Sequence, residues 1–215
     1  GAIIAWQDGR NGSNFDIYCQ KMNAGGAPQW TLNGVVVCAS QGNQHNLQMT
    51  IDGSGGAIIA WDDQRRITDY DVYAQRIDQN GAPRWASNGI AVASSGGGPN
   101  ETGTQVVSDG QGGAIIAWFY DWLLMMCDIR AQRVNADGVA QWGAPGRYVT
   151  NASPNMKATS YFRMIGDAAQ GAIVAWDDSR GTVEQFDGLD DYNVYAQRIN
   201  SNISNISSRA YVGTG

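Results

Sequence analysis

The chain has 215 residues, a formal net charge of −6 and 28 glycines, but only two lysines and two glutamates. Lys and Glu favour helices, so their scarcity disfavours a helical protein, and the negative charge provides no basic patch for nucleic acid or anionic lipid. No apolar run reaches the roughly 18 residues that a membrane-spanning helix needs. We therefore predict no nucleic-acid partner and no membrane insertion.

The predicted strands recur along the chain. The first strand, Ala-Ile-Ile-Ala-Trp, follows Gly1, Gly56 and Gly113, and returns as Ala-Ile-Val-Ala-Trp after Gly171. The second begins at Asp16 in the first repeat and reads Asp-Ile-Tyr-Cys-Gln-Lys. A third strand follows a Gly-Ala-Pro-Xaa-Trp turn, and a fourth precedes an Asp-Gly-Xaa-Gly turn. The repeats span residues 1–55, 56–112, 113–170 and 171–215.

Four short β-prone runs per repeat, separated by Gly, Asn, Asp and Pro, are typical of a β-propeller blade. The repeat starts lie 55, 57 and 58 residues apart. We therefore predict an all-β fold, a single β-propeller domain over residues 1–215 with four-stranded antiparallel blades. The tryptophan that ends each Ala-Ile-Ile-Ala-Trp strand is expected to pack between blades, because a small sheet cannot bury both its faces alone.

These motifs resemble the repeats of large secreted bacterial β-propeller proteins, which are distantly similar to the sialidase and Asp-box propellers. The resemblance rests on Gly-Gly-Ala-Ile-Ile-Ala-Trp-Xaa-Asp-Xaa-Arg, Asp-Ile-Tyr-Ala-Gln-Arg and Asn-Gly-Xaa-Pro-Xaa-Trp, and covers residues 1 to about 200. It implies an extracellular or cell-surface protein. It implies little about activity, because propellers host lectins, hydrolases, adhesins and scaffolds.

A Trp-Xaa-Asp-Xaa-Arg motif starts the loop after the first strand in three repeats. A charge-assisted hydrogen bond between its Asp and Arg could fix this loop. Because the motif recurs in repeat after repeat, whereas a catalytic site is unique, we predict a structural role; one glycan pocket per blade is the alternative. The motif residues are Trp6, Asp8, Arg10, Trp61, Asp63, Arg65, Trp176, Asp178 and Arg180.

The third repeat replaces this polar loop with large apolar side chains. An apolar loop on a polar face predicts a contact surface for a partner or ligand. The alternative is a loop folded back over the channel mouth. The predicted contact residues are Phe119, Tyr120, Trp122, Leu123 and Leu124.

The fourth repeat lengthens the same loop with acidic residues. Asp187, Asp190 and Asp191 could hold Ca²⁺ through carboxylate oxygens, although the spacing is not that of an EF-hand and a solvated acidic loop is the alternative. No other cofactor is predicted. A sialidase-like hydrolase would have to use Glu101 or Glu184, both expected in loops. No unpaired set of three arginines stands out, so we predict that the chain is not an enzyme.

Cysteines and glycosylation sequons allow further expectations. Cys19 and Cys38 lie in adjacent predicted strands, where they could form a disulfide or serve as small buried side chains. Five Asn-Xaa-Ser/Thr sequons make the chain a candidate glycoprotein if the host glycosylates secreted proteins. The candidate sites are Asn11, Asn100, Asn151, Asn202 and Asn205.

The strand count leaves one blade incomplete. The first repeat has no strand before Ala-Ile-Ile-Ala-Trp, and the tail after Ser201 can supply one strand through Arg209-Ala-Tyr-Val-Gly but hardly two. An unpaired edge invites pairing with another chain. We expect a processed form or fragment, and a homo-oligomer or larger assembly through this edge. The leading prediction is a non-enzymatic scaffold for adhesion or self-assembly; the alternatives are a lectin-like glycan-binding module and a sialidase-like glycoside hydrolase.

Overall fold

The computed structural model describes residues 1–66, 68–94, 96–123, 126–150, 161–178, 193–200 and 210–214. Every regular element in these ranges is a β-strand, and they contain no helix. The strands form four antiparallel sheets, three of four strands and one of three. The prediction of an all-β fold with four antiparallel sheets is confirmed.

The four sheets follow one another along the chain. Sheet 1 comprises β1 (Ala2–Asp8), β2 (Asp16–Met22) and β3 (Val35–Cys38). Sheet 2 comprises β4 (Gln44–Ile51), β5 (Ala57–Asp63), β6 (Asp71–Ile77) and β7 (Ile90–Ala93). Sheet 3 comprises β8 (Asn100–Ser108), β9 (Ala114–Leu123), β10 (Met126–Val134) and β11 (Arg147–Tyr148). Sheet 4 comprises β12 (Phe162–Gly166), β13 (Ala172–Asp178), β14 (Asn193–Ile199) and β15 (Ala210–Thr214).

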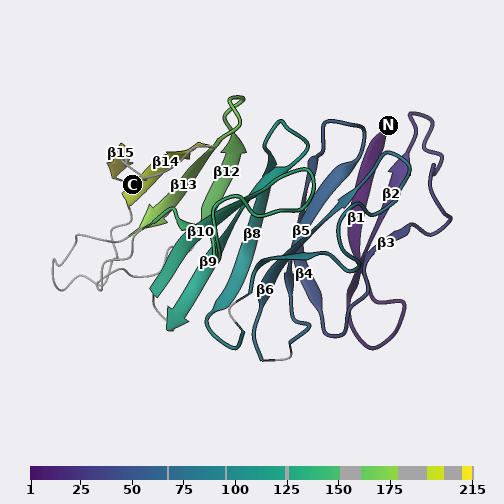
Figure 1. Cartoon of the computed structure of the whole chain (residues 1–215), viewed down its shortest axis with the longest axis horizontal. Coiled ribbons are helices and arrows are strands. Elements are labelled where there is room, and N and C mark those ends of the chain that lie inside the picture. The colour runs from purple at the N-terminus through teal and green to yellow at the C-terminus, as the bar shows by residue number, and fades with distance from the viewer. Residues whose placement is uncertain are drawn as a thin grey trace.

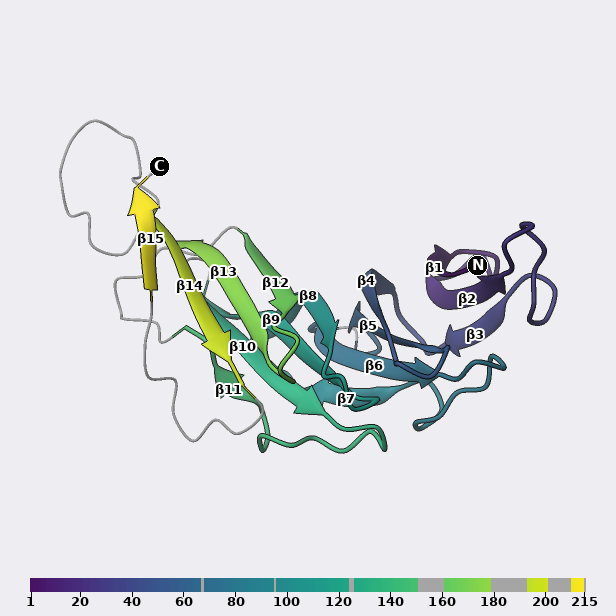
Figure 2. The same ribbon diagram turned by 90° about the horizontal axis from the view of Figure 1, so that it is seen from above.

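The sheets stand side by side in a row (Figure 1). Seen from above, the row is curved, and the two chain ends lie at its opposite ends (Figure 2). The inner strands β4, β8 and β12 are neighbours across successive sheets. The described residues form an open arc of four antiparallel sheets, and no closed propeller ring is seen among them.

The repeated strand has two apolar faces, each covered by a different sheet. In β9, Ile116 and Trp118 pack in the core shared with sheet 2, whereas Ile115 and Ala117 pack in the core shared with sheet 4. This division follows from the two-residue period of a strand, which sends successive side chains to opposite faces. Trp61, Trp118 and Trp176 are buried between sheets, as predicted, whereas Trp6 is only partly buried because no sheet covers its face among the described residues.

Both ends of the array match the strand count. The tail supplies β15, the outer strand of sheet 4, as expected. Strand β1 pairs with β2 along one edge and has no partner on the other among the described residues. Sheet 1 therefore has the open edge that the sequence predicted.

Two segments expected as loops are strands. The apolar segment of the third repeat extends β9 to Leu123, where it pairs with β10. Asn100 and Glu101, expected in a loop, begin β8 and pair with the same extension of β9. The loop assignment was wrong because it was carried over from the other repeats, whose equivalent strands are shorter.

Cys19 and Cys38 are free and buried, so they form no disulfide in this structure. Cys19 lies opposite Val35 and Cys38 lies opposite Ile17, which means that the two cysteines are not register partners. Burial raises the pKa of each thiol to about 12. Both side chains serve as small buried groups in the core between sheets 1 and 2.

Candidate interaction surface at the open end of the array

The Trp-Xaa-Asp-Xaa-Arg motif forms a closed hydrogen-bonded corner. In sheet 2, Trp61 Nε1 donates to Asp63 Oδ2 (2.7 Å), and Arg65 donates from Nε to Asp63 Oδ1 (2.8 Å) and from Nη2 to Asp63 Oδ2 (2.8 Å). The Arg65 guanidinium lies 3.5 Å from the centre of the Tyr73 ring. The corner ties together the end of β5, the following loop and β6, and it contains the charge-assisted hydrogen bond that the Asp-Xaa-Arg spacing allowed.

Sheet 1 contains the same corner. Trp6 Nε1 donates to Asp8 Oδ2 (2.8 Å), and Arg10 Nε donates to Asp8 Oδ1 (2.7 Å). The hydrogen bonds from Arg10 hold the pKa of Asp8 well below its ordinary value. In sheet 4, Trp176 is buried and stacks on Tyr195, but the Asp178 side chain and Arg180 lie outside the described part.

Sheet 3 exchanges the partners of this corner. Tyr120 stands where the other repeats have Asp, and Arg130 stands where they have Tyr. The Arg130 guanidinium lies 3.8 Å from the centre of the Tyr120 ring. The cation–π contact is therefore kept, but here the aromatic ring belongs to the first repeated strand and the arginine to the second. The loss of Asp leaves Trp118 Nε1 buried without a hydrogen-bond partner among the described residues.

The predicted contact residues of the third repeat are divided between two cores. Phe119 packs edge-on against Phe162 of sheet 4, with ring centres 4.9 Å apart, and Tyr120 is buried against sheet 2. Both rings contribute to packing between sheets, which the sequence did not predict. The side chains of Trp122 and Leu123, and all of Leu124, lie outside the described part.

A repeated glutamine positions the tryptophan in the turn after the second repeated strand in sheets 1, 2 and 3. In sheet 2, Gln75 Oε1 accepts from the backbone nitrogen of Trp85 (2.9 Å), and Gln75 Nε2 donates to the carbonyl oxygen of Ala86 (2.7 Å). Gln20 and Gln132 make the equivalent bonds in sheets 1 and 3. The repeated glutamine therefore fixes the turn that carries the indole.

That indole reaches the next sheet. Trp85 Nε1 donates to the carbonyl oxygen of Ala136 in sheet 3 (3.0 Å), and Trp30 Nε1 donates to that of Gln79 in sheet 2 (3.2 Å). A glycine two residues after each carbonyl leaves room for the ring: a Cβ on Gly81 would lie 2.9 Å from Trp30, and one on Gly138 would lie 2.9 Å from Trp85. We call this arrangement the indole latch.

Sequence reasoning missed the latch. The signal was present in the Gly-Ala-Pro-Xaa-Trp spacing, where Gly26 precedes Trp30 and Gly81 precedes Trp85 by four residues. The glycine of one repeat, however, receives the tryptophan of the preceding repeat, and that relation between repeats becomes visible only once the sheets are placed side by side.

The residue after the glutamine clamps the inner hairpin. Arg76 donates from Nη2 to Asp52 Oδ2 (3.0 Å), while Asp52 Oδ1 accepts from the backbone nitrogens of Ser54 (2.7 Å) and Gly56 (2.8 Å). Asp109 and Asp167 form the same clamp in sheets 3 and 4. Sheet 1 has Lys21 at this position, which donates to the carbonyl oxygen of Gly55 in sheet 2 (3.1 Å).

One apolar face of sheet 1 is uncovered. Its residues are equivalent to those that sheet 2 buries against sheet 1, but Ile4 is 50% exposed whereas its counterpart Ile59 is 0% exposed. Register places these side chains on one surface, because Ile4 lies opposite Gln20 and Trp6 opposite Tyr18. We define the N-terminal face as Ala2, Ile4, Trp6, Tyr18 and Met22.

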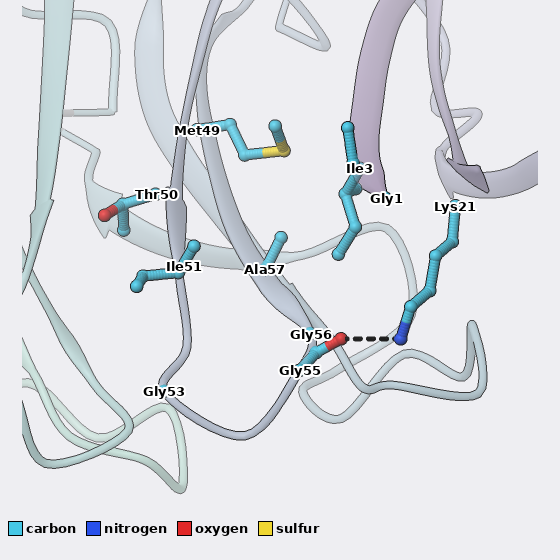
Figure 3. Close-up of a pocket in the computed structure, with 11 residues that line it drawn as sticks. Gly1, Ile3, Lys21, Met49, Thr50, Ile51, Gly53, Gly55, Gly56 and Ala57 are labelled. Carbon is cyan, nitrogen blue, oxygen red and sulfur yellow. Dashed lines mark hydrogen bonds between the residues drawn. The ribbon is translucent and has the colours of Figure 1, made fainter. Parts of the chain in front are cut away.

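A notch lies beside the free edge of β1 (Figure 3). It has a volume of about 480 Å³ and separates Ile3 of β1 from Met49 and Ile51 of β4. Lys21 lines its lower end and bonds to Gly55 there (Figure 3). Met49 occupies in β4 the position of Val106 in β8, which packs against the core between sheets 2 and 3. Met49 is exposed because sheet 1 has no inner strand to cover it.

The other end of the array exposes the opposite face of the repeat. Ile173 is 40% exposed, although the equivalent residue Ile115 of sheet 3 is fully buried by sheet 4. Ile165 lies directly opposite Ile173 and is more exposed still. We define the C-terminal face as Tyr161, Ile165, Ile173 and Val194.

The acidic residues proposed for hydrolysis do not form an open site. Glu101 is 0% exposed, and neither of its carboxylate oxygens has a hydrogen-bond partner among the described residues. Burial, reinforced by the charge of Asp71, raises the pKa of Glu101 to about 8. Glu184 lies outside the described residues. Within the described ranges, no group of three acidic, histidine or cysteine side chains is arranged to hold a metal ion.

Several predicted sites fall outside the described part of the chain. Asp187, Asp190 and Asp191, the calcium candidates, lie there, as do the sequons at Asn151, Asn202 and Asn205. Asn11 is exposed in the loop between β1 and β2, where its side chain donates to Asn14 Oδ1 (2.7 Å). Asn100 is exposed at the start of β8 and accepts from the backbone nitrogen of Tyr70 (3.2 Å).

Comparison with known proteins yields one distant structural neighbour to report. No protein-family model matches the sequence, and no curated protein matches it. Among solved structures, the chain is similar to an endo-arabinase from Bacteroides thetaiotaomicron VPI-5482, with 13% sequence identity and a TM-score of 0.46. The similarity covers 99% of this chain and 76% of the endo-arabinase. The described residues contain no helix that could span a membrane.

Proposed function

We propose that the chain is a non-enzymatic structural module that builds larger β-sheet arrays by stacking further sheets on its two ends. The observation that carries the proposal is the contrast between Ile4, half exposed in β1, and Ile59, fully buried in β5. Burying apolar surface of this kind contributes about 25 cal/mol per Å², so covering the N-terminal face is favourable. The free edge of β1 adds unpaired backbone groups to the same surface.

The N-terminal and C-terminal faces are also complementary. Inside the array, every junction places the Ala/Ile/Trp side of one repeated strand against a sheet that presents the opposite side. The C-terminal face presents that opposite side, as Ile173 does in β13. Contact between the two faces of different copies is heterologous and would give a chain of molecules, or a ring if the curvature closes. A cell-surface location, which the repeat resemblance implies, would be compatible with such an assembly.

Light scattering across a range of protein concentrations tests the proposal. We expect the mass to rise above 23.1 kDa with concentration, and Ile4→Lys to return it to that value, because a charge would then have to be buried in the contact. Val139→Lys is the matched control, since Val139 is an exposed apolar residue in the β10–β11 turn, away from both end faces. A mass that stays at one chain throughout, with no effect of Ile4→Lys, would contradict self-association.

The lectin-like and hydrolase alternatives predict other results. A glycan-array signal that is lost in Trp122→Ala would favour a glycan-binding module, because aromatic rings stack on sugar rings. Turnover of a glycoside that is lost in Glu101→Gln or Glu184→Gln would favour an enzyme. We rank both below the structural module because Phe119 and Tyr120 pack between sheets and Glu101 is fully buried.

A further inference from the structure

Next to the N-terminal face, sheet 1 has the glycine and the carbonyl oxygen of an indole latch, but no tryptophan ring lies against them among the described residues. Ala24 and Gly26 of sheet 1 stand at the positions of Gln79 and Gly81 in sheet 2, and of Ala136 and Gly138 in sheet 3. Gly26 has the same left-handed backbone, with φ of 80° against 87° and 83° for its two counterparts. A Cβ on Gly26 would meet nothing within 4 Å, however, whereas one on either counterpart would lie 2.9 Å from a tryptophan ring.

The carbonyl oxygen beside this space is also unused. Gln79 and Ala136 accept a hydrogen bond from the indole of the preceding sheet, and each accepts a second bond from a cation of that sheet, Lys21 (3.4 Å) or Arg76 (3.2 Å). Within the described residues, no hydrogen bond to the Ala24 oxygen occurs. Sheet 1 therefore has an acceptor and a ring-sized space of the kind that is filled at both of the next two junctions.

We propose that the N-terminal face is a docking site for a β-sheet whose own turn carries Pro-Xaa-Trp, and that this tryptophan enters the space at Gly26 and donates to Ala24. The inference rests on the proposed stacking function, and it names a sheet that would fit the N-terminal face more completely than sheet 4 of a second copy. It follows from continuity with the interior, where the junction between sheets 1 and 2 and the junction between sheets 2 and 3 each combine an apolar core with the latch.

The latch distinguishes this partner from a second copy that docks through its sheet 4. No tryptophan follows Trp176 in the sequence, so sheet 4 has no indole to offer. A copy arriving by that route would cover Ile4 and Trp6 but leave Gly26 empty. A repeat like that of sheet 2, whose Pro83-Arg84-Trp85 turn makes the latch with sheet 3, supplies both contacts.

The partner would also complete the inner edge of sheet 1. A segment that continues from such a sheet into an inner strand and an Asp-Gly-Xaa-Gly turn would pair with β1 and fill the notch beside Met49. Its aspartate would meet Lys21, as Asp52 and Asp109 meet Arg76 and Arg133. Docking of one such sheet would thus pair the free edge of β1, bury the N-terminal face and place an indole at Gly26.

A chain extended by its own repeat tests this inference. Residues 44–112 are duplicated ahead of Gly1, so that the Gly112–Gly1 junction reproduces the native Gly112–Gly113 junction. Hydrogen exchange is then followed by NMR at the β1 amides and at the indole Nε1–H of the added Trp85. We expect both to be slowed at least about tenfold relative to the unextended chain and to an exposed indole.

Two glycine variants of the extended chain isolate the latch. Gly26→Ala is expected to return the added indole to fast exchange, because the methyl group would occupy the ring's position. Gly12→Ala is the matched control: Gly12 also has a left-handed φ of 74° and open space around it, but lies in the β1–β2 loop. The control should leave the indole protected while imposing the same backbone strain.

The outcomes separate the two proposals. If the β1 amides are protected but the added indole exchanges freely, or if Gly26→Ala has no more effect than Gly12→Ala, the latch is overturned and stacking stands. If neither the amides nor the indole gain protection, the sheet does not dock, and the proposed stacking function fails together with the inference.

Discussion

Strands β1 and β5 carry the same sequence, Ala-Ile-Ile-Ala-Trp, in two different surroundings. Every residue of β5 is buried, because sheet 1 covers one face, sheet 3 the other, and β4 pairs with its free edge. In β1 only Asp8 is buried. The same strand sequence is therefore buried on both faces in sheet 2 and exposed on one face in sheet 1, and the predictions below test how much that difference contributes.

The largest difference is expected at the equivalent isoleucines. Ile59→Ala should destabilise the protein by about 2–5 kcal/mol, because it leaves a cavity in the core between sheets 1 and 2, whereas Ile4→Ala should cost less than about 1 kcal/mol. Chemical denaturation of both variants measures the two free energies of unfolding. Equal losses would show that β1 is covered in solution.

A buried carboxyl group should make stability depend on pH. The pKa of Glu101 is raised from 4.5 to about 8, so the folded protein retains a proton that the unfolded chain releases. Its stabilising effect is complete below pH 4.5 and is lost as pH rises through 8. Between pH 5 and 7.5 the wild type should lose about 3 kcal/mol that Glu101→Gln does not lose. Unfolding curves across this range provide the test, and parallel pH profiles for the two proteins would refute the raised pKa.

Gly26 and Gly81 have nearly the same left-handed φ, so the backbone strain caused by alanine is expected to be similar at the two positions. Gly81→Ala and Gly26→Ala both place a side chain at a left-handed φ, but only the first meets a ring, that of Trp30. We expect Gly81→Ala to be more destabilising by about 1–3 kcal/mol, the usual cost of overpacking. Thermal unfolding measured side by side gives the difference. A Gly26→Ala variant of the unextended chain that is equally destabilised would argue against an empty space there.

The smallest effect is expected at the exposed corner of sheet 1. Arg10 is 42% exposed in its side chain, so Asp8→Asn should cost at most about 1 kcal/mol at neutral pH. The pKa of Asp8 is lowered by Arg10, which means that its contribution is present above the ordinary pKa of aspartate and fades as pH falls below it. Urea titrations at pH 7 and at pH 3 should show the difference between wild type and variant shrinking in acid. A difference that grew toward pH 3 would be inconsistent with this pairing.

Much of the sheet structure could be predicted from repetition alone. The strand order within each sheet, the unpaired edge of β1 and the strand in the tail all followed from counting blocks, and the Trp61–Asp63–Arg65 corner followed from a spacing of two residues. These features depend on neighbours in sequence or in an adjacent strand, so the local pattern specifies them.

Prediction failed where a repeat departs from its register. Phe119 and Tyr120 were placed in a loop because the loop was expected to begin directly after the tryptophan in every repeat, whereas the repeated strand continues for two residues beyond it in sheets 1, 2 and 4 as well. In the structure β9 continues through them, and strand alternation sends Phe119 toward sheet 4 and Tyr120 toward sheet 2. The same extension buries Glu101 by pairing β8 with β9. An apolar run of this length fits an exposed loop or a buried strand equally well, and only the neighbouring sheets decide.

The sequence by itself therefore determined what each repeat is: a small antiparallel sheet with two apolar faces, a hydrogen-bonded corner and a tryptophan-bearing turn. The tertiary structure alone decided which faces are covered, that the sheets of the described residues form an open arc, and that Gly26 receives no indole from these residues although its counterparts do. The physical reason is that hydrogen bonding within a sheet is local, whereas burial depends on a neighbouring sheet that is distant along the chain or absent from it.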